Sequence, residues 1–487
     1  MRYWKLAGVL LCAVLLGSAL PGRAQNMSQL MGWQKLTGAT TNYSGATDGI
    51  MNDRQNSYLW SAAFHGDYLY AGTARNVVGA VLTEYKPKTW PPDVPIPTDM
   101  RARIYRMKVS TGVWEQFYLA NTLPVPGMPF AIGPDAGYRM MKEYTAPGGK
   151  PVLYVGGMGV VTPARLLAID AQNNAPVPIF SAAGTSIRAI AEYNNQLFWA
   201  SDVKGVPAIW YNSDPLKAYQ QNAAVVYDKI AVPGDWFPKG AEILDMVSFN
   251  GSLYVFFFDH DWDNGGFWCA KLKKSGTAWK WTLIVGDMTK GAQYPKGMGR
   301  TENGGATPIV FNNQMYVGTI SNTMWRFLNG SPPDFHNLPA TGTQIFRFNA
   351  ADNWERVMPL PAATTMGMEA QANGFFNPLN LYLWRFTVAN GKLYAGTFDA
   401  RVALESFGMD LSSLNLWNPD GFDLYSTMDG KMWTPESVDG FGDKWNYGAR
   451  TLLTDPKNGD LYLGTANPFY GCQLWRKKAG GLLNLNR

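Results

Sequence analysis

The sequence predicts an all-β fold built from a repeated unit, and three observations predict it. A short phrase of apolar, aromatic and small residues returns along the chain, further strand-like segments flank each copy, and a matching segment precedes the first copy. Short runs of aromatic and β-branched residues between turn residues are typical of strands. Self-similarity at a blade-like spacing is typical of radial or stacked repeat folds.

The phrase recurs seven times, at intervals of 44 to 84 residues counted from Leu69 to Leu461. The shortest interval approximates one repeat unit, so the excess in the others is inserted loop. The copies are Tyr68-Leu-Tyr-Ala-Gly-Thr73, Leu153-Tyr-Val-Gly-Gly157, Leu197-Phe-Trp-Ala-Ser201, Leu253-Tyr-Val-Phe-Phe257, Met315-Tyr-Val-Gly-Thr319, Leu393-Tyr-Ala-Gly-Thr397 and Leu461-Tyr-Leu-Gly-Thr465.

Each unit contains four strand-like segments. A first strand precedes the phrase and is joined to it by a tight turn such as Asn194-Asn-Gln196 or Asn250-Gly-Ser252. A third strand such as Gln344-Ile-Phe-Arg347 follows, and then a fourth that often begins with Trp, as in Trp354-Glu-Arg-Val357. Seven units of four antiparallel strands predict a seven-bladed β-propeller.

The N-terminal region supplies a strand that the last unit lacks. That unit ends at Gln473-Leu-Trp-Arg476 without a fourth strand, and Trp33-Gln-Lys-Leu36 has the missing pattern ahead of the first unit. The N-terminal strand is therefore predicted to complete the seventh blade and to close the ring, which removes exposed sheet edges.

The first 24 residues read as a secretory signal peptide, with a basic start, an apolar run over Leu6 to Leu20 and a small-residue cleavage site. Residues 25–487 are then a single propeller domain. The apolar run is short for a membrane span and no later stretch resembles an anchor. We expect a periplasmic or extracellular protein without membrane insertion.

Composition argues against several functions. Removing the three basic residues of the leader from the 42 in the chain leaves 39 basic against 37 acidic residues, so bulk charge gives no reason to expect nucleic acid as a partner. Only three histidines are present, which argues against a multi-histidine metal centre. Cys269 and Cys472 fall in equivalent third strands of nearly opposite blades, so we expect two unpaired, buried thiols.

The long insertions fall on one face of the predicted disc. They lie between second and third strands, or between blades, whereas the other turns are short. Loops on a rigid scaffold commonly carry binding and catalysis, so the loop-rich face is the predicted functional surface.

One repeat position carries an unusual set of side chains. Counting back about nine residues from each phrase aligns residues at the start of the innermost strands, and this predicts a ligand site at the channel mouth made of Arg139, Arg188, Arg450, Trp60, Trp384 and the adjacent Arg385. Arginine forks bind carboxylates and phosphates, and indole faces stack on sugars, so these residues favour an anionic ligand such as an acidic glycan. The alternative is architectural, with each arginine bonded between blades.

A loop in the fourth blade carries acids at alternate positions, Asp259, Asp261 and Asp263. This pattern predicts a Ca²⁺ site, because calcium collects carboxylate oxygens from tight loops. Asn264 stands where glycine usually makes the turn in such loops, and three solvated acids are the alternative.

The segment Ser426-Thr-Met-Asp-Gly-Lys-Met-Trp433 resembles the Asp box of sialidase-like propellers, although Met428 occupies the usual Asp position. Across its length the chain resembles secreted seven-bladed propellers of the broad kelch-like and Asp-box kind. The resemblance implies a fold and names no substrate, because lectins, hydrolases, lyases and scaffolds share these motifs.

The leading functional hypothesis is a secreted propeller that binds a ligand, with an acidic glycan as the candidate, on its loop-rich face. Two alternatives stay open: a glycoside hydrolase or polysaccharide lyase acting on an acidic sugar, and a scaffold that binds another extracellular protein without a small-molecule site. The sequence leaves open whether the chain is an enzyme.

Overall fold

The computed structural model describes residues 31–37, 53–77, 99–127, 131–159, 161–171, 175–182, 184–203, 206–237, 240–261, 264–328, 341–358, 373–406, 408–412 and 419–480. The predicted leader, residues 1–24, and Asp263 of the predicted calcium loop lie outside these ranges. Strands dominate the described chain and nearly all of their pairings are antiparallel.

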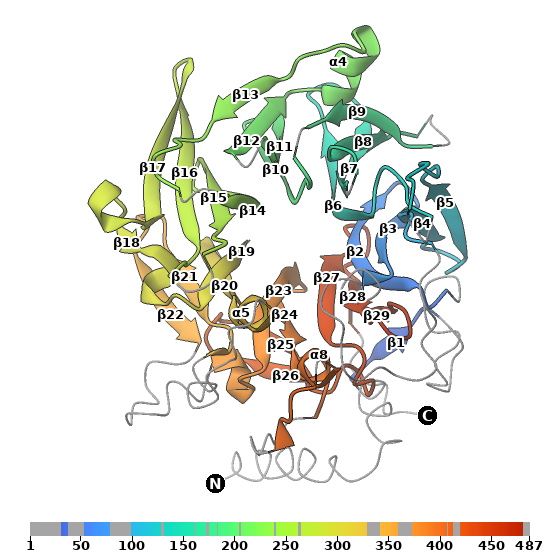
Figure 1. The fold of residues 1–487 in the computed structure, drawn as a ribbon, viewed down its shortest axis with the longest axis vertical. Helices are drawn as coiled ribbons and strands as arrows, with labels where there is room; N and C mark the ends of the chain where they lie inside the picture. Colours follow the sequence, from blue (N-terminus) through green and yellow to red (C-terminus); the bar gives the residue numbers. More distant parts are fainter. Residues whose placement is uncertain are drawn as a thin grey trace.

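The strands fall into groups that we name by their innermost strand. Figure 1 shows the groups around a common centre in chain order, as a β-propeller predicts. The innermost strands are β2 (Asn56–His65), β6 (Gly137–Thr145), β10 (Ala189–Tyr193), β14 (Glu242–Phe249), β19 (Asn303–Phe311), β23 (Asn380–Ala389) and β27 (Gly448–Thr454).

Each innermost strand pairs antiparallel with the strand that carries the phrase. The Asn turns between them adopt the predicted hairpin geometry, since Asn194, Asn195, Asn312 and Asn313 all have positive φ. These second strands are β3 (Tyr68–Arg75), β7 (Pro151–Met158), β11 (Gln196–Val203), β15 (Ser252–Phe258), β20 (Gln314–Ser321), β24 (Lys392–Asp399) and β28 (Leu461–Ala466).

A third and a fourth strand follow outward. The third strands are β4 (Arg103–Lys108), β8 (Arg165–Ile169), β12 (Val206–Asn212), β16 (Trp268–Ser275), β21 (Ile345–Phe348), β25 (Leu424–Thr427) and β29 (Leu474–Lys477). The outermost strands are β5 (Trp114–Leu119), β9 (Val177–Ser181), β13 (Asp228–Ala231), β17 (Ala278–Gly286), β22 (Trp354–Met358), β26 (Thr434–Ser437) and β1 (Trp33–Lys35). A short strand, β18 (Tyr294–Pro295), adds a parallel pairing to β17 that the sequence did not predict.

The N-terminal strand pairs with the last strand of the chain. In β1, Trp33 lies opposite Lys477 of β29, and Lys35 lies opposite Trp475. Trp33 and Trp475 are both buried and pack around Phe441. Figure 1 shows β1 beside β29, so the two ends of the described chain meet in one sheet, as expected for a closed ring.

Neighbouring groups approach so closely that the glycine of the phrase has no room for a side chain. A Cβ on Gly72, Gly156, Gly318, Gly396 or Gly464 would lie between 2.5 and 2.8 Å from an atom of the next group. The threonine of the phrase has a separate role. The hydroxyl groups of Thr319, Thr397 and Thr465 each accept a hydrogen bond from the backbone N–H at the start of the third strand.

Neighbouring groups are also linked by β-sheet pairing of single residues, for example Ala74 with Gly137 and Phe398 with Gly448. Such links join most groups into one 20-stranded sheet, while the β10 group forms a separate four-stranded sheet and the β14 group a five-stranded one.

Three loops that precede innermost strands share a further motif, a glycine followed six residues later by a buried asparagine. The pairs are Gly297 and Asn303, Gly374 and Asn380, and Gly440 and Asn446; each asparagine Nδ2 donates to the carbonyl oxygen of its glycine at 2.8–2.9 Å. Each Nδ2 also donates a hydrogen bond to the side chain of the residue just before the third strand of its group. These residues are Gln344, Asp423 and Gln473, respectively.

Asp423 is the exception in this series, because a carboxyl group replaces an amide. The Nε2 groups of Gln344 and Gln473 donate to oxygens of Asn373 and Asp443. Asp423 is fully buried, and its Oδ1 has no hydrogen-bond partner. Burial, together with the nearby Asp399 carboxyl, raises its pKa well above the ordinary value. Glutamine supplies an N–H donor at this position in the other two groups, and protonation would give Asp423 an O–H donor there.

Short helices occupy connections between strands: α4 (Pro215–Gln221), α5 (Thr323–Leu328) and α8 (Arg401–Ser406). In the part of the chain that the structure describes, no helix is long and apolar enough to cross a bilayer. Cys269 and Cys472 are both buried and form no disulfide, which confirms the predicted unpaired thiols.

Gly396→Ala should destabilise the fold. The new Cβ would lie 2.5 Å from the Cβ of Ala449 and 3.1 Å from Leu452, and overpacking of this kind costs about 1–3 kcal/mol. Gly234→Ala is the matched control, since nothing lies within 4 Å of its Cβ position. Urea unfolding measures both. Equal midpoints would contradict the close approach between β24 and β27.

Asp423→Asn should stabilise the fold at neutral pH. Because folding raises the pKa of this carboxyl, it favours the protonated form; that contribution is fully present below about pH 4 and is lost as the pH rises. Asparagine offers the donor without a proton, so the free energy of unfolding should exceed that of wild type by about 1 kcal/mol or more at pH 7 and match it near pH 4.

Urea unfolding at pH 4, 5.5 and 7 tests this pH dependence. Asp429→Asn is the control, because backbone N–H groups of Met432 and Lys431 lower the pKa of the exposed Asp429. That variant should gain no stability as the pH rises. An Asp423→Asn variant less stable than wild type at pH 7 would show that the ionised carboxylate is the stabilising form.

Candidate functional site

At the repeat position aligned from the sequence, at the start of the innermost strands, most residues lie in β-bulges. The pairing of first and second strands shifts register around Trp60, Arg139, Leu244, Trp384 and Arg450, so each is an extra residue with no partner on the second strand. A bulge breaks the alternation of side chains and can redirect one of them. In β19 the shift surrounds Gly304, and Ala306, which the sequence alignment placed here, pairs normally with Thr319.

Trp60 and Arg139 form one contact between neighbouring groups. The Arg139 guanidinium carbon lies 4.4 Å from the centre of the Trp60 ring. Gly137 makes this packing possible, because a Cβ there would lie 2.1 Å from Trp60 Cζ3. The Nη2 group of Arg139 lies 3.1 Å from the sulfur of Met158, and its buried Nε has no hydrogen-bond partner.

Trp384 and Arg450 repeat this arrangement on another pair of groups. The Arg450 guanidinium carbon lies 5.1 Å from the Trp384 ring centre, and Gly448 provides the room for the indole. Arg450 is only 8% exposed, its Nε has no hydrogen-bond partner, and it forms no ion pair with any residue that the structure describes.

Arg188 and Arg385 differ because each has a carboxylate partner. Arg188 lies just before β10, and its Nε is 2.6 Å from Oε1 of Glu242 in the next group. His260 Nε2 lies 3.7 Å from the other oxygen of Glu242. Burial opposes ionisation of Glu242, but Arg188, His260 and Arg139 together lower its pKa to about 2.

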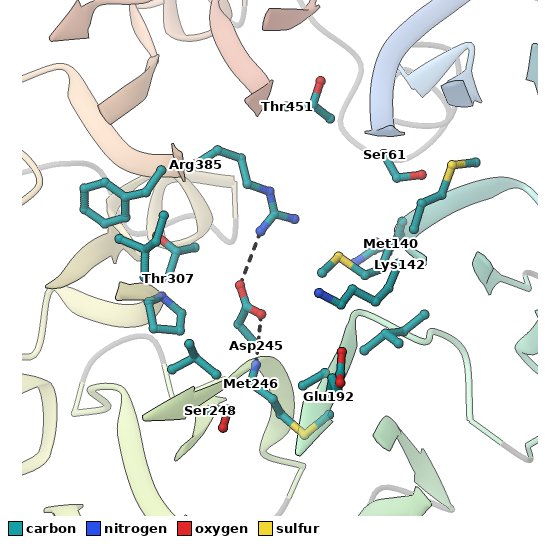
Figure 2. Close-up of a pocket in the computed structure, with 18 of the residues that line it drawn as sticks. Ser61, Met140, Lys142, Glu192, Asp245, Met246, Ser248, Thr307, Arg385 and Thr451 are labelled. Carbon is teal, nitrogen blue, oxygen red and sulfur yellow. Dashed lines mark hydrogen bonds and ion pairs between the residues drawn. The ribbon is translucent and has the colours of Figure 1, made fainter. Parts of the chain in front are cut away.

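The partner of Arg385 lies across the centre. Its Nη1 is 3.3 Å from Oδ2 of Asp245 in β14, although the whole β19 group lies between β14 and β23. The β19 residue at this level is Thr307, which also lines the cavity. Figure 2 shows the Arg385 guanidinium directed at the Asp245 carboxylate.

Tyrosines form a layer beyond the bulged residues, toward the starts of the innermost strands. The hydroxyl groups of Tyr58 and Tyr447 are hydrogen-bonded, and the Tyr58 ring lies 5.9 Å from that of Trp384 and 6.2 Å from that of Trp60. Tyr382 and Tyr447 are buried. Burial raises the pKa of Tyr58 to about 12, so these phenols are neutral at ordinary pH.

A cavity of about 820 Å³ lies on the other side of the bulged residues. It extends from Trp60 and Arg139 to Asn194 and Asn195, in the turn between β10 and β11. Its direction therefore differs from the sequence prediction, because it reaches the short-turn face and not the loop-rich one. On the loop-rich side, Tyr58, Tyr382 and Tyr447 pack in one hydrophobic cluster with side chains of other groups, such as Leu244 and Met324.

Lys142 and Glu192 add charged groups to the cavity wall. Figure 2 shows the Lys142 amine directed into the space in front of Asp245. Lys142 forms no hydrogen bond or ion pair with the described residues. Within the cavity, then, Arg139 and Lys142 have no carboxylate partner, whereas Arg385 shares Asp245.

The arginines are close enough to affect one another. Burial lowers the pKa of Arg139 to about 9, with a further contribution from the positive charge of Arg188. Burial also lowers the pKa of Arg450, followed by repulsion from Arg385 and Arg139. Asp245 shows the opposite response, since burial raises its pKa despite the neighbouring Arg385. Positive charge at the centre is therefore only partly neutralised by the chain itself.

The two described acids of the predicted calcium loop bind their own loop. Asp259 is 2% exposed; its Oδ1 accepts from the N–H of Asp261 and its Oδ2 from the indole N–H of Trp268. Asp261 Oδ1 accepts from the N–H of Asn264. Among the described residues no group of three metal-ligating side chains lies together, and Asp263 is not one of them.

Sequence reasoning missed Lys142, Glu242 and Asp245. Asp245 directly follows the bulged Leu244 of β14, and Glu242 lies two residues before it. The repeat alignment shows nothing distinctive at either position. The only available signal was an acid in an innermost strand that is otherwise apolar. Lys142 gave no signal, because a lysine within a strand is ordinary.

No protein-family model and no curated protein matches the sequence. Among solved structures, the GH74 enzyme of Niastella koreensis is 12% identical, with 87% of this chain and 52% of that chain covered and a TM-score of 0.44. The β-propeller domain of the Trilobed protease from Pyrococcus furiosus is 7% identical, with 86% and 94% covered and a TM-score of 0.43.

The Trypanosoma rangeli sialidase in complex with sialic acid is 9% identical, with 89% of this chain and 55% of that chain covered and a TM-score of 0.37. The chain thus spans about half the length of the GH74 enzyme and of the sialidase. These are distant likenesses of fold, and any function has to be argued from the residues at the centre.

Proposed function

We propose that the chain is an exported seven-bladed β-propeller whose blades each contain four antiparallel strands. The repeated order of pairings supports this organisation, with β18 as an addition to one blade and β1 as the fourth strand of the last. Single-residue links between blades account for the 20-stranded sheet. The leader at residues 1–24 supports export to the periplasm or the extracellular space.

We further propose that the propeller binds an anionic ligand, an acidic glycan in particular, in its axial cavity. The observation that carries the proposal is Arg450, nine-tenths buried with neither a hydrogen bond nor an ion pair. A buried charge without a partner costs several kcal/mol, so proteins rarely retain one unless something else neutralises it. Arg139 lines the axial cavity, and its positive charge repels that of Arg450, which is not a lining residue itself. A ligand carboxylate bound at Arg139 would therefore also offset the charge of Arg450.

The surroundings favour a sugar acid. A volume of about 820 Å³ is in the range of small-ligand sites, and Trp60, Phe386 and Tyr193 provide ring surfaces beside polar groups. Rings of this kind stack on the apolar faces of sugars, while guanidinium forks bind the carboxylate. The ligand residues in this proposal are Arg139, Arg385 and Trp60, which line the cavity. Arg450 and Trp384 are not lining residues and act by their charge and packing, and Arg188 is held by Glu242 in a supporting position.

The scaffold alternative has its own support, since Arg188 and Arg385 are paired with carboxylates of other groups. In that case another extracellular protein is the partner. Calcium at Asp259, Asp261 and Asp263 also stays a proposal. Asp259 is turned into its own loop, so a bound ion would require this carboxylate to give up its bond to Trp268.

An enzyme of the hydrolase or lyase class is favoured by one observation, Asp245. It is buried in the cavity wall, and burial raises its pKa, which is the property of a carboxyl group that donates a proton. In this alternative Asp245 protonates the leaving oxygen of a sugar whose carboxylate is held by the arginines.

Arg450→Met should weaken ligand binding, because it removes positive charge beside the cavity, and should stabilise the free protein. Methionine keeps the packing on Trp384 and removes the uncompensated charge, so the free energy of unfolding should rise by about 1 kcal/mol or more. Calorimetry with galacturonate, and with galactose as the neutral comparison, measures binding; urea unfolding measures stability. Wild type should bind galacturonate only.

Arg476→Met is the matched control, because this arginine lies in β29 and donates to Gln34, away from the axis. It should leave galacturonate binding unchanged. If Arg450 has a purely structural cation–π role, its replacement should instead lower stability by about 0.5–2 kcal/mol and wild type should bind no acidic sugar. That result would favour the scaffold alternative.

Asp245→Asn should separate binding from catalysis. The amide keeps the size of the side chain and cannot donate a carboxyl proton, so turnover of polygalacturonate should fall by about 100-fold or more while galacturonate binding persists. Release of reducing ends, and of unsaturated product by absorbance, measures turnover. No turnover by wild type, or equal rates in both proteins, would contradict the enzyme alternative.

A further inference from the structure

The axial cavity is surrounded laterally by the innermost strands. Residues from all seven innermost strands line it, from β2 through β27. At one end, beyond Trp60 and Arg139, the tyrosine layer of Tyr58, Tyr382 and Tyr447 packs in one hydrophobic cluster with Leu244 of β14 and Met324 of α5, and this cluster closes the cavity. At the other end it reaches the turn at Asn194 and Asn195. A ligand therefore enters along the axis from the short-turn face.

This shape restricts how a polymer can bind. A groove accepts the middle of a chain, because the chain can leave at both ends. An encircled cavity with one closed end accepts only a chain terminus, because a middle segment would have to fold back on itself inside a space lined on all sides by strands.

Two cationic groups lie at different depths on the same strand. Arg139 is at the closed end of β6 and Lys142 is three residues closer to the opening, a separation of about 10 Å at the usual rise of a strand. Residues three apart normally point to opposite faces of a sheet. Here the bulge adds one residue at Arg139, so Arg139 and Lys142 point to the same face of the sheet. Both side chains therefore line the cavity.

We propose that the cavity binds the terminus of an acidic oligosaccharide end-on, with one acidic group held by Arg139 at the closed end and a second held by Lys142 near the opening. This inference rests on the proposed binding of an acidic glycan. It adds the direction in which the glycan chain enters, the closed end of the cavity at which its terminus stops, and a second position for an acidic group. Glu192, on the neighbouring β10, lies near the opening. In this arrangement its carboxylate accepts hydrogen bonds from sugar hydroxyl groups.

Calorimetry with galacturonic acid oligomers of one, three and ten residues tests the inference. End-on binding predicts one protein per chain at every length. Affinity should rise from the monomer to the trimer, as the second acidic group reaches Lys142, and then stay level. Binding along the side of a chain predicts several proteins per decamer, and that stoichiometry would overturn the proposal.

Lys142→Met tests the second anion position. It should weaken binding of the trimer by about tenfold, which corresponds to the loss of one charge-assisted hydrogen bond, and leave the monomer affinity unchanged. Lys431→Met is the control, because this exposed lysine lies near Glu355 on an outer turn.

An equal effect of Lys142→Met on monomer and trimer, or no effect on either, would overturn the two-position arrangement. Binding of none of the oligomers by wild type would instead contradict the proposed function itself. The two failures are therefore distinguishable within one set of titrations. Thermal unfolding of both lysine variants confirms that each is folded before titration.

Discussion

The close approach of each second strand to the next innermost strand is the constraint on which the rest of the structure depends. Gly72, Gly318 and Gly396 allow it, since a Cβ at these positions would overlap the neighbouring group. Single backbone pairs such as Ala74 with Gly137 then fix the groups side by side. Innermost strands held at this spacing cannot separate or tilt freely, so their side chains meet at a centre of fixed width.

The bulges convert this common architecture into a site. In a regular strand, side chains alternate between faces, and only every second residue would face the axis. An extra residue in β2, β6, β23 and β27 places an indole or guanidinium there without shifting the rest of the strand. β19 has no extra residue at this position, since Ala306 and Thr307 pair consecutively with Thr319 and Gly318. The Arg385–Asp245 pair joins the strands on either side of β19.

Local patterns made much of this fold predictable. The phrase indicated the second strands because alternation and a close-packed glycine are properties of single strands, and Asn194-Asn195 indicated a hairpin because asparagine tolerates positive φ. The Gly297–Asn303 motif was also visible as a repeat, but it was missed because its spacing falls in loops. The bulges, Lys142 and the Arg385–Asp245 pair could not be predicted, because each depends on a register or on two strands separated by a whole group.

The contrast between Arg188 and Arg450 bears most directly on function. Both come from the same repeat position, and for Arg188 the next group supplies a carboxylate, Glu242. For Arg450 the partner is the face of Trp384, which fixes the guanidinium plane but leaves its N–H edge unpaired. A guanidinium group that is already held in one orientation loses little conformational entropy when a carboxylate binds it. Retaining a buried charge in that state weakens the empty protein and strengthens the liganded one, which is the balance expected of a binding site rather than of a structural joint.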